Sequence, residues 1–142
     1  MTGRETGSES GAESGAESGA EAAFALAGRL FDAARHGDAA TLIRYLDAGV
    51  PPDLTNSAGD SLLMLASYNG HPAIVRDLVG RGADVDKAND RGQTPLAGAV
   101  FKGHTSTARL LHEAGADPDA GTPSARDAAR MFERTDLTEL FG

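Results

Sequence analysis

Four histidines, His36, His71, His104 and His112, are the side chains best suited to metal binding or acid–base catalysis in this chain of 142 residues. His71 and His104 each follow a glycine between two predicted helices, so they belong to separate helix pairs. Neighbouring packed helices lie roughly 8–10 Å apart, whereas each ligand of a zinc ion lies about 2 Å from it. His36 and His112 lack the closely spaced partners typical of a metal site. We therefore interpret His71 and His104 as polar side chains that bond loop backbone, and we expect no metal.

Two pairs of carboxylates, Asp84 with Asp86 and Asp117 with Asp119, have a spacing that could suit acid–base chemistry. Each pair follows directly after a predicted helix, in a loop. A carboxylate at such a position can accept backbone N–H bonds and so shape the loop. A structural role is therefore our interpretation of both pairs.

Other signatures of catalysis are missing from the sequence. The chain contains no Cys, which excludes disulfides, thiolate metal sites and a cysteine nucleophile. No serine stands in the strand–turn–helix context of a nucleophile elbow. Most of the 18 glycines lie in an N-terminal arm or at repeated turns, and they form no phosphate-binding loop. We therefore expect a protein that is not an enzyme, with no catalytic residue and no cofactor.

The elements that position these residues form a repeat. Asn89 to Gly121 predicts a short helix capped by Thr94 and running to Lys102, a break at Gly103-His104, and a second helix from Thr105 to Glu113. A loop follows. Equivalent positions recur at one constant spacing: Gly37, Gly70 and Gly103; Gly49, Gly82 and Gly115; Leu30, Leu63 and Leu96; Tyr45, Leu78 and Leu111; Asp53, Asp86 and Asp119. A fixed period of this length indicates a stacked array of repeats.

At this point the chain resembles the ankyrin-repeat family. The resemblance rests on GDSLLMLASYNGHPAIVRDLVGRGADVDKAN and GQTPLAGAVFKGHTSTARLLHEAGADPDA. It implies an all-α ankyrin-repeat solenoid of about three to four helix–turn–helix repeats with β-hairpin-like loops. The expected repeats are 22–55, 56–88, 89–121 and 122–142.

The first and last repeats depart from the pattern. The first lacks the Thr-Pro-Leu start, and its helix from Ala22 should bury an apolar face, namely Phe24, Leu26, Leu30, Phe31 and Ala34. In the second repeat Ser61 is the expected cap and Leu62 replaces the family's proline. The last repeat should keep helices near Pro123 to Phe132 and near Asp136 to Phe141, with about four residues deleted between them. Such atypical terminal repeats are typical of caps.

Residues 1–21 form an acidic arm rich in Gly, Ala, Glu and Ser. Its five glutamates, against Arg4 alone, carry half of the net charge of −8. Such a segment buries too little apolar area to fold, so we expect a disordered N-terminus, with a recruitment motif as the alternative. Residues 22–142 are expected to form one ankyrin-repeat domain.

Charge and hydropathy restrict the partners. A net charge of −8 argues against nucleic acid, which needs a basic surface. No apolar run is long enough for a signal peptide or a membrane span. The default expectation is a cytoplasmic protein without a membrane partner.

In the family, specificity comes from the loop tips and from the inner helices. Carried onto this chain, the resemblance implies a protein-binding surface made of Arg35, His36, Ser57, Ala58, Asp60, Tyr68, Asn69, Asp90, Arg91, Gln93, Phe101 and Lys102. Tyr68 and Phe101 occupy the same repeat position, and we expect them to be largely exposed binding anchors. The alternative is that each ring packs over its own loop.

The expected function is a non-catalytic scaffold that binds another protein through the concave face and the loop tips. The alternatives are a small-molecule-binding accessory subunit of an enzyme and a self-associating structural module. A monomer is expected.

Overall fold

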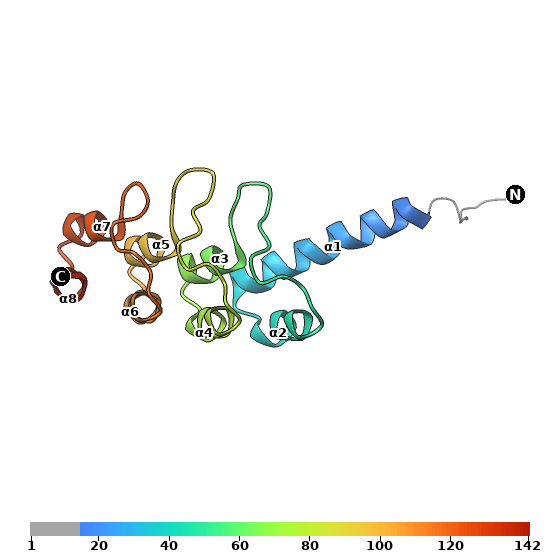
Figure 1. The fold of residues 1–142 in the computed structure, drawn as a ribbon, viewed down its shortest axis with the longest axis horizontal. Helices are drawn as coiled ribbons and strands as arrows, with labels where there is room; N and C mark the ends of the chain where they lie inside the picture. The colour runs from blue at the N-terminus through green and yellow to red at the C-terminus, as the bar shows by residue number, and fades with distance from the viewer. Residues whose placement is uncertain (1–14) are drawn as a thin grey trace, which may run out of the picture.

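The computed structural model describes residues 15–142. In this range the chain forms eight helices: α1 (Gly15–His36), α2 (Ala39–Asp47), α3 (Leu62–Tyr68), α4 (Pro72–Gly80), α5 (Pro95–Phe101), α6 (Thr105–Glu113), α7 (Ala125–Met131) and α8 (Thr135–Phe141). The four helix pairs stack side by side, and long loops between the pairs project in one direction (Figure 1). The predicted all-α ankyrin-repeat solenoid is confirmed.

The helices form two rows. The inner row is α1, α3, α5 and α7, and the outer row is α2, α4, α6 and α8. One apolar core runs between the rows, in which Leu63 and Leu96 of the inner row and Leu78 and Leu111 of the outer row are buried. Burying these side chains is the main stabilising contribution to a stack of this kind.

The inner helices begin at caps that the sequence supplies. Ser61 Oγ accepts a hydrogen bond from the Met64 N–H at 2.9 Å, and Thr94 Oγ1 accepts one from the Ala97 N–H at 3.2 Å. Ser124 caps α7 in the same way. These bonds satisfy N–H groups that have no partner inside the helix. The caps expected at Ser61 and Thr94 are therefore present.

The projecting loops are hairpin-like and joined to one another. In the first loop Thr55 and Ser61 form an isolated antiparallel bridge. The Asp84 N–H donates to Asp53 Oδ1 of the preceding loop, and the Asp117 N–H donates to Asp86 Oδ1, both at 2.9 Å. These two bonds are the same contact one repeat apart, and we call them the loop ladder.

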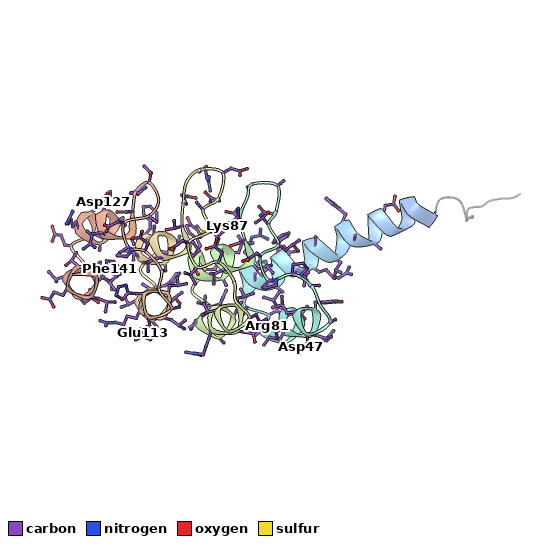
Figure 2. All side chains as sticks on the ribbon, viewed as in Figure 1. Asp47, Arg81, Lys87, Glu113, Asp127 and Phe141 are labelled. Atoms are coloured by element: carbon purple, nitrogen blue, oxygen red, sulfur yellow. The ribbon has the colours of Figure 1, made fainter. Side chains whose placement is uncertain are left out.

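Outside the core, an ion-pair group links the end of α2 to the end of α4. The Arg81 guanidinium donates to Asp77 on its own helix and to Asp47 at the end of α2. Figure 2 shows Asp47 and Arg81 beside each other at this end of the outer helices. The side chain of Asp47 is largely exposed, so the bridge adds little to stability.

The first helix differs from the prediction in two respects. It begins at Gly15 rather than at Ala22, so residues 15–21, expected in the disordered arm, are helical; residues 1–14 lie outside the described residues. Alanine and glutamate favour helix, which accounts for the extension. The expected burial of Phe24 is wrong, because its side chain is 83% exposed. α1 spans 22 residues against seven in α3, so it runs past its neighbour (Figure 1).

The last repeat is also shorter, but its missing residues are not where the sequence analysis placed them. The turn between α7 and α8 has the same length as the turn between α5 and α6. The missing residues are in the loop 114–124, which is three residues shorter than the loop 81–94. Helix pairs keep their short turn because it fixes their packing, whereas a projecting loop tolerates deletion.

Candidate functional site

Two adjacent pockets lie between the inner helices and the projecting loops. The first, which we call the polar pocket, has a volume of about 260 Å³ and is lined by Arg35, Asp60, Met64, Leu65, Tyr68, Asn69, Arg91 and Gln93. Its residues come from the end of α1, from α3 and from two loops. Six of the predicted site residues are therefore brought together here.

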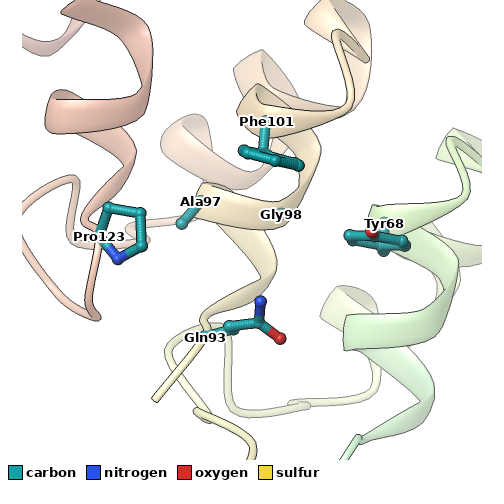
Figure 3. A pocket seen from close by; sticks show the side chains of 6 residues that line it. All are labelled: Tyr68, Gln93, Ala97, Gly98, Phe101 and Pro123. Carbon is teal, nitrogen blue, oxygen red and sulfur yellow. The ribbon is translucent and has the colours of Figure 1, made fainter. Parts of the chain in front are cut away.

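The second pocket, which we call the apolar pocket, lies one repeat further along. It has a volume of about 70 Å³ and is lined by Tyr68, Gln93, Ala97, Gly98, Phe101 and Pro123 (Figure 3). Tyr68 and Gln93 line both pockets, so they separate the two. We call the two pockets together the inner-helix groove.

Gly98 sets the distance between α3 and α5 at this point. A Cβ atom placed on Gly98 would lie 3.0 Å from Met64 Cε and 3.3 Å from Tyr68 Cδ1. The absent side chain lets the Tyr68 ring lie against α5, as Figure 3 shows. A larger residue at this position would displace the ring.

The two predicted aromatic anchors differ in exposure. Phe101 is 51% exposed, and its ring meets Phe132 edge-on with centroids 5.4 Å apart. Tyr68 is only half-buried rather than largely exposed, and Lys102 Nζ lies 5.2 Å from its ring centroid. Each ring therefore contacts the following repeat. These contacts differ from the alternative, in which each ring packs over its own loop.

Several groove residues are held by hydrogen bonds. Asn89 Nδ2 donates to Asp60 Oδ1 at 2.8 Å and to Gln93 Oε1 at 2.9 Å. Asn69 Nδ2 donates to the Leu65 carbonyl at 2.8 Å. The polar pocket is therefore preorganised around a buried asparagine, which lowers the ordering cost of binding.

The remaining predicted residues lie outside both pockets. Ser57, Ala58 and Asp90 are exposed at the loop tips, where the Asp90 N–H donates to the Ala58 carbonyl at 3.1 Å. His36 is exposed at the end of α1. The pockets bring together the helix residues and the loop residues near the helices, but not the tips.

Asn89 is the main groove residue that the sequence analysis missed. It is buried, and its Oδ1 accepts the N–H groups of Arg91 and Gln93 at 3.0 Å. Asn56 makes the equivalent bonds to Ala58 and Asp60 one repeat earlier. The signal was present, because Asn56 and Asn89 have the same spacing as the other repeated positions.

Of the residues first considered for chemistry, His71 and the paired aspartates have structural contacts. His71 Nε2 lies 2.9 Å from the Arg35 carbonyl oxygen, which supports its interpretation as a backbone-bonding side chain. Asp84 and Asp117 each accept the N–H of the residue two positions on, Asp86 and Asp119, at 3.0 and 2.9 Å. Within residues 15–142 no His, Asp and Glu side chains converge in a way that could hold a metal ion. Among the described helices none combines the length and the apolar character needed to cross a bilayer.

Comparison with known proteins gives two findings. A family model described as ankyrin repeats in three copies matches residues 30–122. A protein of Pseudomonas aeruginosa described as an ankyrin repeat protein is 56% identical over 48 residues, which cover 34% of this chain. That match spans 28% of the relative's own length.

Proposed function

The chain belongs to the ankyrin-repeat family, and from that premise we propose that it is a non-catalytic scaffold that binds a partner protein through the inner-helix groove. Repeats of this family are generally protein–protein interaction modules. The observation that carries the proposal is the pair of adjacent pockets divided by Tyr68, with Phe101 and Lys102 at the rim. Tyrosine and arginine, which both line the polar pocket, are enriched among residues that dominate binding energy.

Pocket size favours a protein partner over the small-molecule alternative. Sites for small molecules have volumes of about 300–1,000 Å³ and enclose most of the ligand. The two pockets, of about 260 and 70 Å³, are smaller and separate. They fit side chains that project from a larger partner.

Removal of either aromatic ring tests the proposal. Tyr68→Ala and Phe101→Ala should each weaken partner binding about 30-fold, which corresponds to about 2 kcal/mol and to the usual scale of a binding hot spot. The partner is first captured from cytosol of the source cells with the full chain and then titrated against each variant. Thermal melts recorded in parallel report the stability of each variant.

Phe24→Ala is the matched control, since Phe24 is an exposed ring on α1 and precedes the groove residue Arg35 by about three turns of that helix. It should bind like the unchanged protein. If Tyr68→Ala and Phe101→Ala lose stability but bind normally when folded, both rings are packing residues and the groove is not the binding site.

Self-association is the second candidate, because large apolar side chains are exposed near both ends of the stack. Phe24 is 83%, Met131 62% and Phe132 45% exposed. Our proposal is a monomeric, cytoplasmic scaffold. Light-scattering mass measured over a range of concentrations, together with cell fractionation, tests both points.

A further inference from the structure

The inner-helix groove is basic on an acidic protein. The whole chain has a net charge of −8, but Arg35 and Arg91 line the polar pocket and Lys102 stands at its edge. The one carboxylate in the pocket, Asp60, already accepts a hydrogen bond from Asn89. The groove is therefore complementary to negative charge.

The two guanidinium groups remain accessible to a ligand. Arg91 is exposed, and in the described part of the chain no carboxylate lies within ion-pair distance of it. Arg35 donates to Asp32 at 2.7 Å, but the Asp32 side chain is 65% exposed, so this pair contributes little and can be exchanged. Guanidinium groups bind carboxylates in a bidentate geometry that a lysine cannot match.

The apolar pocket, which lies next to the polar pocket, accepts a different kind of side chain. Its walls are two aromatic rings, Pro123 and the small residues Ala97 and Gly98. Its volume of about 70 Å³ is about a quarter of that of the polar pocket, so it accepts a smaller group. The branched end of a valine or leucine is of this size.

The spacing of the two pockets selects the conformation of the ligand. They belong to consecutive repeats, so we infer their separation from the spacing of packed helices, about 8–10 Å. In a polyproline II segment, residues i and i+3 project on the same side about 9 Å apart. In a β-strand the nearest such pair, i and i+2, is only about 7 Å apart.

Gln93 provides a donor for the backbone of such a segment. Its Oε1 accepts from Asn89, which leaves Nε2 free to point into the space between Tyr68 and Pro123 (Figure 3). A polyproline II segment makes no internal hydrogen bonds, so its carbonyl groups can accept from this amide. A helix would offer no free carbonyl along its length.

We propose that the groove binds an extended acidic segment of the partner protein, in which an Asp or Glu for the polar pocket stands three residues from an aliphatic residue for the apolar pocket. This inference rests on the proposed function, because it names the chemistry of the partner at the same groove.

Selection from a phage-displayed library of random linear peptides tests the inference, with the full chain as bait. The enriched peptides should share an acidic and an aliphatic residue at a spacing of three. In a synthetic copy of the best peptide, Glu→Gln or Asp→Asn should weaken binding about tenfold, the scale of a charge-assisted hydrogen bond. Added salt should weaken it further.

A charge-reversed groove provides the decisive comparison. The double variant Arg35→Glu/Arg91→Glu should enrich Lys or Arg at the position where the unchanged protein enriches Asp or Glu. Arg76→Glu, an exposed change on the outer helix α4, is the matched control and should leave the preference unchanged. Circular dichroism melts confirm that the variants compared are folded.

The outcomes separate the inference from the proposed function. Peptides that need Tyr68 and Phe101 but show no acidic preference, or no spacing of three, overturn the inference and leave the groove as the binding site. Peptides that bind Tyr68→Ala and Phe101→Ala as well as the unchanged protein overturn both. A library that yields no binder to the groove also overturns the inference.

Discussion

Glu133 is the one non-glycine residue in residues 15–142 with a positive φ, at 54°. It occupies the turn between α7 and α8, where the other three repeats have Gly37, Gly70 and Gly103 with φ between 73° and 85°. For a residue with a Cβ atom this region costs about 1–2 kcal/mol. Glycine adopts it without that cost.

Glu133→Gly should therefore raise the free energy of unfolding by about 1 kcal/mol. The thermal midpoint should rise by several degrees, because about 1 kcal/mol produces a shift of this size in a domain of this length. Differential scanning calorimetry measures the shift. Glu133→Asn, which tolerates the left-handed region better than Glu does, should fall between the two. An unchanged or lower midpoint for Glu133→Gly would show that the turn is not strained.

At the scale of single residues, the sequence predicted those contacts that depend on local sequence or on the position of a residue within the repeat. Ser61 and Thr94 make the expected caps, which depend on local sequence. His71 bonds backbone as expected, but its partner, the Arg35 carbonyl, lies in the last turn of α1 and not in a loop. The exposure of Phe24 was not predictable, because helical periodicity does not reveal where a neighbouring helix ends. Tyr68 is less exposed than expected because Gly98 lies opposite it in another repeat.

At the scale of the elements, α4 is an outer helix with neighbours on both sides, α2 and α6. Leu78 lies on its buried face and is completely inaccessible to solvent. A truncated side chain there leaves a cavity that the two flanking helices cannot close without moving.

Leu78→Ala is expected to lower the free energy of unfolding by about 2–5 kcal/mol. Urea denaturation followed by circular dichroism measures it. Val79→Ala, on a half-buried position of the same helix, should cost clearly less. Equal losses for the two variants would contradict the assigned register of α4.

The third loop is tied to α7 by an ion pair. Arg126 Nε donates to Asp119 Oδ1 at 2.7 Å, and Nη2 donates to Oδ2 at 3.3 Å. The hydrogen bond from Arg126 lowers the pKa of Asp119 below its ordinary value of 3.8. The folded state therefore binds this proton more weakly than the unfolded state does.

The resulting contribution to stability is fully present above pH 3.8 and is lost as the pH falls through the lowered pKa of the folded state. Asp119→Asn should be less stable than the unchanged protein at neutral pH, and the difference should shrink in acid. Arg126→Gln should behave in the same way, since it removes the donor. Thermal melts from neutral pH into this acidic range test this, and parallel stability curves would contradict it.

The elements were predictable because their ends are encoded locally, by Thr94-Pro95 at a helix start and by glycines at the turns. The position of the deletion in the last repeat was not. Residues 114–124 and the turn 132–134 both contain polar and turn-forming residues, so spacing alone does not show which segment lost residues. Packing of α8 against α6 requires the turn to keep its length.

At the scale of the whole molecule, the first helix, α1, is much longer than the other helices of the described stack. α1 continues well beyond α3 (Figure 1). Its residues 21–25 are exposed. This part of the helix makes little contribution to the common core, which begins to include α1 at Leu26 and Ala27.

Deleting Met1 to Gly19 should therefore leave the melting temperature nearly unchanged. The shift should be smaller than the several degrees that about 1 kcal/mol produces in a domain of this size. Deleting Met1 to Ala27 is the comparison, and it should lower the melting temperature because it removes Leu26 and Ala27 from the core. A large drop for the shorter deletion would mean that the arm docks on the stack.

The loop ladder also determines how a chain of this kind can change in length. Its two bonds, from Asp84 to Asp53 and from Asp117 to Asp86, are the same contact made twice. Each bond joins two neighbouring repeats and does not depend on the total number of repeats. A tandem duplication of residues 56–88 would create one new junction and would supply the same donor and acceptor there. Loss of a single residue within α3 or α4, between Asp53 and Asp84, would instead move a donor away from its acceptor. Gene changes that add or remove one whole repeat are thus less disruptive to this backbone than far smaller ones.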